Sequence, residues 1–257
     1  MKLKLLMALS LLLSINSFAQ CPPDGVFNSQ AEIDGFAINY PDCTSIDQLD
    51  ISGNDISDLT PFSNLTQITS LEIHDTTVLA SLNGLQNFTG ILSYDFLPML
   101  RIENNISLSD ISALSNVVDN TYDLNIHIID NPVLQSLNGL QSIVNTYIVE
   151  IRNNDNLLSL NGLNNLSGAD EIYINDNDGL INMQGLGTLI NYGILQISNN
   201  DGLESLNGLN IQGGGGLSLI GNLNLTDISA IDDSVFDEVF GIKVHMYGSL
   251  SLTGKGH

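Results

Sequence analysis

The sequence predicts a mainly β repeat solenoid, in which short coils stack and one strand from each coil joins a single long parallel sheet. Three observations support this fold class. An asparagine recurs mostly about every 23 residues, a short apolar and polar alternation precedes it, and apolar residues occupy every third position after it. The seven asparagines are Asn54, Asn105, Asn131, Asn154, Asn177, Asn200 and Asn222.

Residues 1–19 are expected to lie outside this fold, as a secretory signal peptide. Lys2 and Lys4 form a charged start, Leu5 to Leu13 an apolar stretch, and Ser17-Phe-Ala19 a cleavage site of small residues. This order is typical of exported proteins, so the sequence predicts a secreted or cell-surface location. Attachment of a lipid at Cys21 is the less favoured alternative.

Residues 20–46 are expected to form an N-terminal cap. Cys21 and Cys43 are the two cysteines of the chain, and in an exported protein such a pair is most simply one disulfide. Between them, the Ser29-Gln-Ala-Glu32 segment fits a helix capping box. The helix is expected to end at Pro41 and to bury an apolar face made of Ile33, Phe36 and Ala37. A solenoid needs a cap because its first coil otherwise exposes core side chains and an unpaired strand edge.

Residues 47–257 are expected to form eight coils, with a less certain ninth around Val244. In each coil, an alternation such as Leu71-Glu-Ile73 predicts a short strand with one buried face. The return segment after each asparagine keeps one edge inward, as in the series Leu157, Leu160, Leu163 and Leu166. Stacked coils therefore place each apolar residue above its counterpart, which gives one continuous core.

The recurring asparagines are expected to form a buried ladder, in which each amide side chain bonds the next. Backbone N–H and C=O groups lose their sheet partners where the chain leaves a strand, and an inward amide can both donate to and accept from them. A glycine in the Asn-Gly-Leu or Gln-Gly-Leu segment of the coil suits a corner with positive φ. These glycines are Gly84, Gly139, Gly162, Gly185 and Gly208.

The charge of the mature chain excludes several classes of partner. Without residues 1–19, the chain has 238 residues and a formal charge of 4 − 29 = −25. Such a surface repels nucleic acid and anionic membranes. The abundant, periodic leucine and isoleucine exclude disorder. We therefore expect a folded protein, most simply a monomer, without membrane insertion.

Several segments resemble a known group of proteins. Cys21-Pro-Pro-Asp-Gly25, the Gln30 to Phe36 helix, Tyr40-Pro-Asp-Cys43 and the coils that follow resemble secreted bacterial receptor-L-domain proteins, which are relatives of leucine-rich-repeat proteins. The first coil, Leu49 to Phe62, is also similar to internalin repeats. The resemblance implies a right-handed coil and a surface or secreted protein that recognises or adheres to a partner. Such proteins often carry a C-terminal sorting module, and since none is visible here, a fragment or a freely secreted protein is expected.

The outward positions of the strands are the most informative candidate surface. Three of the four basic residues and three of the four histidines of the mature chain fall among these positions. The sequence therefore predicts a less negative stripe that binds an extracellular protein or glycan. Its residues are His74, Arg101, Glu103, His127, Glu150, Arg152 and Tyr173. Two alternatives stay open: opposite charges on neighbouring strands favour strand pairing alone, or the protein is a purely structural matrix component.

Metal binding and catalysis find less support in the sequence. Acidic turns around Asp155, Asp178 and Asp201 raise the possibility of calcium, but their spacing fits neither an EF-hand loop nor a calcium-binding β-roll. No motif of a hydrolase or metalloprotease occurs. We therefore predict no metal, no cofactor and no enzymatic activity. The alternative is a polysaccharide-active β-helix enzyme, for which Asp232 and Asp233 are candidate carboxylates.

Overall fold

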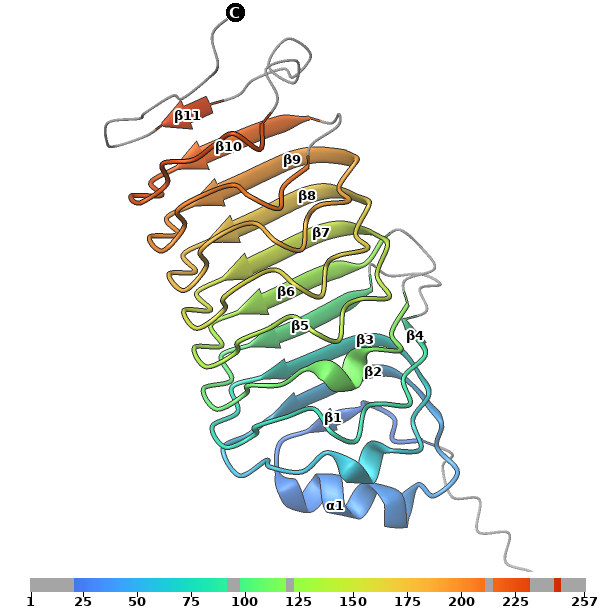
Figure 1. Cartoon of the computed structure of the whole chain (residues 1–257). Coiled ribbons are helices and arrows are strands. Elements are labelled where there is room, and N and C mark those ends of the chain that lie inside the picture. Colours follow the sequence, from blue (N-terminus) through green and yellow to red (C-terminus); the bar gives the residue numbers. More distant parts are fainter. Residues whose placement is uncertain (1–20, 92–97, 119–122, 211–214, 232–242, 246–257) are drawn as a thin grey trace, which may run out of the picture.

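The computed structural model describes residues 21–91, 98–118, 123–210, 215–231 and 243–245. In these residues the chain winds into a stack of coils, and each coil adds a strand to one parallel sheet (Figure 1). The sheet order is β1-β2-β3-β5-β6-β7-β8-β9-β10-β11, with β4 also paired to β3. The predicted mainly β repeat solenoid is therefore confirmed. The signal peptide predicted at residues 1–19 lies outside the described residues.

The secondary structure consists of short elements. The strands are β1 Val26–Phe27, β2 Ser45–Ser52, β3 Gln67–His74, β4 Gly90–Ile91, β5 Met99–Glu103, β6 Asn125–Ile129, β7 Asn145–Arg152, β8 Gly168–Asn175, β9 Asn191–Ser198, β10 Gly216–Ile220 and β11 Lys243–His245. The helices are α1 Gln30–Asn39 and two 3-10 turns, η1 Thr60–Phe62 and η2 Ser112–Leu114. The ninth coil expected around Val244 corresponds to β11, which pairs with β10.

The register of the sheet repeats without a slip along the stack. Each residue of a strand lies opposite the equivalent residue of its neighbour, so outward side chains form continuous rows. One outward row runs through Asp50, Glu72, Arg101, His127, Glu150, Tyr173, Gln196 and Ser218. A second outward row runs through Ser52, His74, Glu103, Ile129, Arg152, Asn175, Ser198 and Ile220.

The core is one continuous column inside the coils. The inward residues of the strands, such as Ile151 and Ile174, are fully buried, and so are the leucines of the return segments. The predicted inward series Leu157, Leu160, Leu163 and Leu166 is confirmed, since each is 0% exposed. Burial of one such side chain stabilises the fold by about 1.5–3 kcal/mol.

The buried asparagine ladder is present over most of the stack. Asn154 shows its geometry: Nδ2 donates to the carbonyls of Ile128 at 2.8 Å and Arg152 at 3.0 Å, and the backbone N–H donates to Oδ1 of Asn177 at 3.0 Å. Its own Oδ1 accepts from the backbone N–H of Asn131 at 3.2 Å. One amide therefore joins its own turn to the coils on both sides. The same arrangement links Asn105, Asn131, Asn154, Asn177, Asn200 and Asn222.

The prediction for Asn54 is wrong, because this residue is exposed and lies outside the ladder. The ladder instead ends at Thr76, which is 0% exposed and donates its hydroxyl to Oδ1 of Asn105 at 2.8 Å. The physical reason lies in the preceding residue. Gly53 has φ of 150°, whereas the residue before each following ladder position has a left-handed φ of 54–69° that turns the next side chain inward.

The residues with left-handed φ form a further row, distinct from the two outward rows, that the sequence interpretation missed. Asp and Asn alternate there, and both residue types tolerate positive φ better than other non-glycine residues. Asn104 Nδ2 donates to Asp75 Oδ1 at 2.6 Å, and Asn153 Nδ2 donates to Asp130 Oδ1 at 2.6 Å. Because aspartate and asparagine alternate along the row, a carboxylate in one coil has an amide donor in the next coil. The row is Asp75, Asn104, Asp130, Asn153, Asp176 and Asn199.

The predicted glycine corners are confirmed. Gly84, Gly139, Gly162, Gly185 and Gly208 have φ between 94° and 124°. At Gly162, a Cβ atom would lie 2.0 Å from the carbonyl oxygen of Leu137 in the preceding coil. Glycine is therefore required both for the conformation of this corner and for the close approach of neighbouring coils.

The cap closes the N-terminal end of the stack (Figure 1). Helix α1 begins after Ser29, whose hydroxyl accepts from the backbone N–H of Glu32, and it buries Ile33 and Phe36. Ala37 was expected on the buried face but is exposed. The predicted disulfide is present, with 2.05 Å between the sulfurs of Cys21 and Cys43. Aromatic rings of Phe27, Phe36 and Phe62 pack edge to face beneath the first coil.

The ladder makes a direct prediction for Asn154→Leu. The leucine removes the side-chain partner of buried backbone groups in two coils, so the free energy of unfolding should fall by about 1–3 kcal/mol. Asn54→Leu is the matched control, because Asn54 is exposed and should change stability by no more than about 0.5 kcal/mol. Denaturant unfolding of both variants measures the difference. Equal stability of the two variants would contradict the ladder.

Candidate functional site

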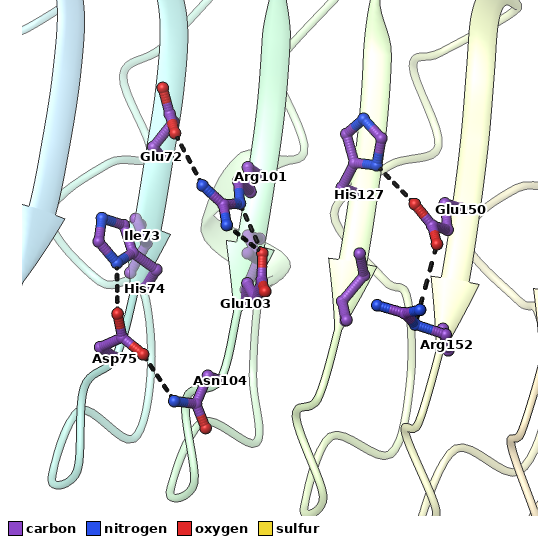
Figure 2. A network of polar contacts seen from close by, with 12 residues as sticks. Glu72, Ile73, His74, Asp75, Arg101, Glu103, Asn104, His127, Glu150 and Arg152 are labelled. Carbon is purple, nitrogen blue, oxygen red and sulfur yellow. Dashed lines mark hydrogen bonds and ion pairs between the residues drawn. The ribbon is translucent and has the colours of Figure 1, made fainter.

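The seven predicted recognition residues lie on the outer face of the sheet, on β3 and β5 to β8. The two outward rows place their side chains in register, so the predicted residues form a band rather than a scattered set. Figure 2 shows a first polar network around Arg101, a second network around Glu150, and a separate set of contacts that joins His74 to Asp75 and Asp75 to Asn104. Tyr173 lies next to the second network, opposite Glu150.

The first network holds Arg101 between two carboxylates. Arg101 Nε donates to Glu103 Oε2 at 2.6 Å, and one terminal nitrogen lies 3.4 Å from Glu72 Oε2 (Figure 2). Glu72 also accepts from the side-chain amide of Gln48 at 3.1 Å. These contacts fix the guanidinium on the face and neutralise it.

His74 also lies between two carboxylates. Its Nδ1 is 2.8 Å from Asp75 Oδ2, and its Nε2 is 3.0 Å from Asp50 Oδ1. Both ring nitrogens can donate only in the imidazolium form, so this geometry favours the charged ring. Partial burial lowers the pKa of His74, but hydrogen bonds and charges from Asp75 and Asp50 outweigh that effect and raise the pKa above its usual 6.5.

The second network is less complete. His127 Nδ1 lies 3.0 Å from Glu150 Oε2, and Arg152 Nε lies 3.8 Å from Glu150 Oε1 (Figure 2). The first distance is that of a hydrogen bond, whereas the second is an ion pair too long for one. Glu150 is therefore shared between the side chains of His127 and Arg152, and Arg152 is held more loosely than Arg101.

Tyr173 begins the less charged part of the face. Its hydroxyl donates to Glu171 Oε2 at 3.0 Å on the same strand. Burial, followed by the hydrogen bond and charge of Glu171, raises the pKa of Tyr173, so the phenol stays neutral at physiological pH. Towards β10 the outward positions carry amide, hydroxyl and aliphatic groups, including Gln196 and Ile194.

The structure changes the electrostatic interpretation of the band. Each of the predicted basic residues, His74, Arg101, His127 and Arg152, has a carboxylate within 4 Å, so the band is internally paired. The sequence already indicated Glu72 beside Arg101 as an opposite-charge pair on adjacent strands, and this pair is present. Sequence reasoning missed Asp50 and Asp75 as the partners of His74. Cross-strand pairs of this kind contribute roughly 0.2–1 kcal/mol each to strand pairing.

Ile129 corrects one detail of the outward rows. The alternation places it outward, yet its side chain is only 5% exposed. Glu103 and Arg152 flank it in the row, and the stems of such long side chains cover apolar surface. An isoleucine at this position therefore lies beneath the polar contacts of the face.

The acidic turns form a row beside the strand ends. Asp155, Asp178 and Asp201 line a shallow hollow together with Asp176 and Leu223. Asp178 Oδ1 accepts from the backbone N–H of Asp201 at 3.2 Å, as expected for a structural turn. Within the described ranges, no group of three or more His, Cys, Asp or Glu side chains is arranged to hold a metal ion. The candidate carboxylates Asp232 and Asp233 lie outside the described residues.

The fold and the face together define a capped, mainly β repeat solenoid. Comparison with protein-family models, with curated proteins and with solved structures found no match. Among the helices that the structure describes, none has the length and apolar character to cross a membrane.

The His74 site predicts a pH-dependent contribution to stability. Because the pKa of His74 is raised in the folded protein, this contribution is complete below about pH 6.5 and is lost as the pH rises through the folded pKa. The difference in unfolding free energy between wild type and His74→Gln should therefore shrink as the pH rises. Denaturant unfolding across a pH series measures it.

An NMR titration provides the control for this pH effect. Asp50→Asn removes a negative charge next to the ring and should lower the pKa of His74, whereas Asp47→Asn alters an exposed carboxyl of the same strand and should leave it unchanged. A pKa of His74 at or below 6.5 in the wild type would contradict the proposed imidazolium.

Proposed function

We propose that this protein is a non-enzymatic, extracellular recognition protein that binds its partner through the outer face of the parallel sheet. The proposal rests on the set of side chains that the strand register aligns on this face. Beside the charged networks, the strands β8 to β10 present the ring of Tyr173, the amides of Asn175 and Gln196 and the aliphatic chain of Ile194. Ile194 is 43% exposed, so this part of the face is accessible to a partner.

The disulfide supports an extracellular setting for this function. Disulfides such as Cys21–Cys43 form and persist in oxidising environments outside the cytosol. Membership of the receptor-L-domain or leucine-rich-repeat group is part of the same proposal, because the resemblance of the cap and coils to that group implies recognition or adhesion. A secreted or surface location follows from the proposed signal peptide.

A structural matrix component is the second candidate, and the saturated ion pairs favour it. Arg101 and His74 are each held by two carboxylates of the same face, so they are not available to a ligand without breaking those contacts. A structural matrix component needs only such internal pairing of charges. It does not require the half-buried ring of Tyr173 or the exposed aliphatic chain of Ile194.

Binding to an array of extracellular proteins and glycans distinguishes the two candidates. The mature protein should bind a partner, and Gln196→Trp on the sheet face should abolish binding by blocking the flat surface. Asn161→Trp, on an exposed return segment, is the matched control and should bind normally. An absence of binding across the array, or equal binding by both variants, would contradict recognition through this face.

A further inference from the structure

The two arginines of the face differ in how their donors are used. Arg101 makes hydrogen bonds to Glu103 and Glu72. In the described part of the chain, the guanidinium of Arg152 makes none, and its Nε is buried without a hydrogen-bond partner. A guanidinium carries five N–H donors in a planar fork, so Arg152 retains the four donors of its two terminal nitrogens unused, in addition to the buried Nε–H.

The nearest carboxylate, that of Glu150, cannot accept hydrogen bonds from these donors in its present position. Glu150 Oε1 lies 3.8 Å from Arg152 Nε, and its Oε2 is held by His127 at 3.0 Å. The side chain of Arg152 is 42% exposed although its Nε is buried, so a ligand from solvent must use the two terminal nitrogens. A planar oxyanion that approaches from outside can form the bidentate contact that Glu150 does not form.

The neighbours of Arg152 indicate what else the ligand presents. Asn175 lies opposite Arg152 in the next strand, and Ser198 donates to Asn175 Oδ1 at 2.7 Å. This bond orients the amide and leaves its Nδ2 without a partner among the described residues. The bond from Tyr173 to Glu171 likewise orients the phenol ring, which offers a flat apolar surface beside these polar groups.

We propose that Arg152 anchors the ligand by binding the carboxylate of an acidic sugar residue, such as a uronic acid, within an otherwise neutral glycan. This inference rests on the proposed recognition function and names its ligand chemistry. The ring of Tyr173 packs against the sugar, and Asn175 and Gln196 bond its hydroxyl groups.

The acidic residues around Arg152 favour a ligand that carries a single, isolated carboxylate. Glu150 and Glu171 flank the site, and the chain as a whole has a large excess of acidic residues. A polyanion therefore meets repulsion beyond the single contact with Arg152. A protein partner fits the site less well, because protein interfaces are anchored by large side chains in well-packed pockets, whereas this site offers one ring and small polar groups.

Isothermal calorimetry on the mature protein tests this assignment with paired oligosaccharides. One member of each pair ends in glucuronic acid and the other in glucose, so the two differ only in the carboxylate. We expect the acidic member to bind and the neutral member to bind roughly 10- to 100-fold more weakly, as for loss of a charge-assisted contact.

Matched variants assign the effect to one arginine. Arg152→Gln should weaken binding of the acidic sugar by the same factor, and Arg152→Lys should restore part of it because the charge remains without the fork. Arg101→Gln should bind as the wild type does. Thermal unfolding of each variant checks that the fold is intact, and Arg152→Lys keeps the test decisive if Arg152→Gln unfolds.

Three results would overturn the inference. Equal binding of the acidic and neutral sugars, or full binding by Arg152→Gln, rejects the role of Arg152 while recognition through the face, tested by Gln196→Trp, still stands. Binding of an acidic peptide but not of the acidic sugar rejects the glycan and leaves a protein as the partner. An absence of binding across the whole array of extracellular proteins and glycans rejects the proposed function itself.

Discussion

The buried asparagine ladder is the constraint on which the rest of the structure depends. Where strands β3 and β5 to β10 end, the backbone turns through a left-handed residue and loses its sheet partners. The side-chain amide of Asn154 replaces them with bonds to the carbonyl of Ile128 in the coil before, to its own turn and to Oδ1 of Asn177 in the coil after. Since every amide is both donor and acceptor for its neighbours, one coil cannot shift its register without breaking bonds in two others.

This constraint also determines the arrangement of the outer face of the sheet, which is the proposed recognition surface. With the ladder facing inward, the outward residues of every strand are set in two unbroken rows, and residues from distant parts of the sequence become neighbours. The rows bring Arg101 next to Glu72 and Glu103, which saturate it. The same rows leave Arg152 beside a glutamate that His127 already holds. The difference in availability between the two arginines is thus a consequence of register.

The repeat made most of the fold predictable from the sequence. A period of 23 residues identifies inward and outward positions directly, so the core leucines, the glycine corners and the outward rows could be predicted. The pattern was misleading where backbone conformation differs: Asn54 has the spacing of a ladder residue, but the unusual φ of Gly53 directs it outward. Thr76 was missed because a hydroxyl replaces the amide there. The pairing of His74 also escaped prediction, since it depends on side-chain positions that spacing does not specify.

The central claim is that the ladder amides act cooperatively along the stack, and a double-mutant cycle tests it most directly. The cycle compares the unfolding free energies of Asn131→Ala, Asn154→Ala and the double variant. Because the Oδ1 of Asn154 accepts both the N–H and the Nδ2 of Asn131, the losses should be non-additive, with a coupling energy of about 0.5–3 kcal/mol. Additive losses, equal to the sum of the single variants within error, would show that each amide acts alone and would contradict the account.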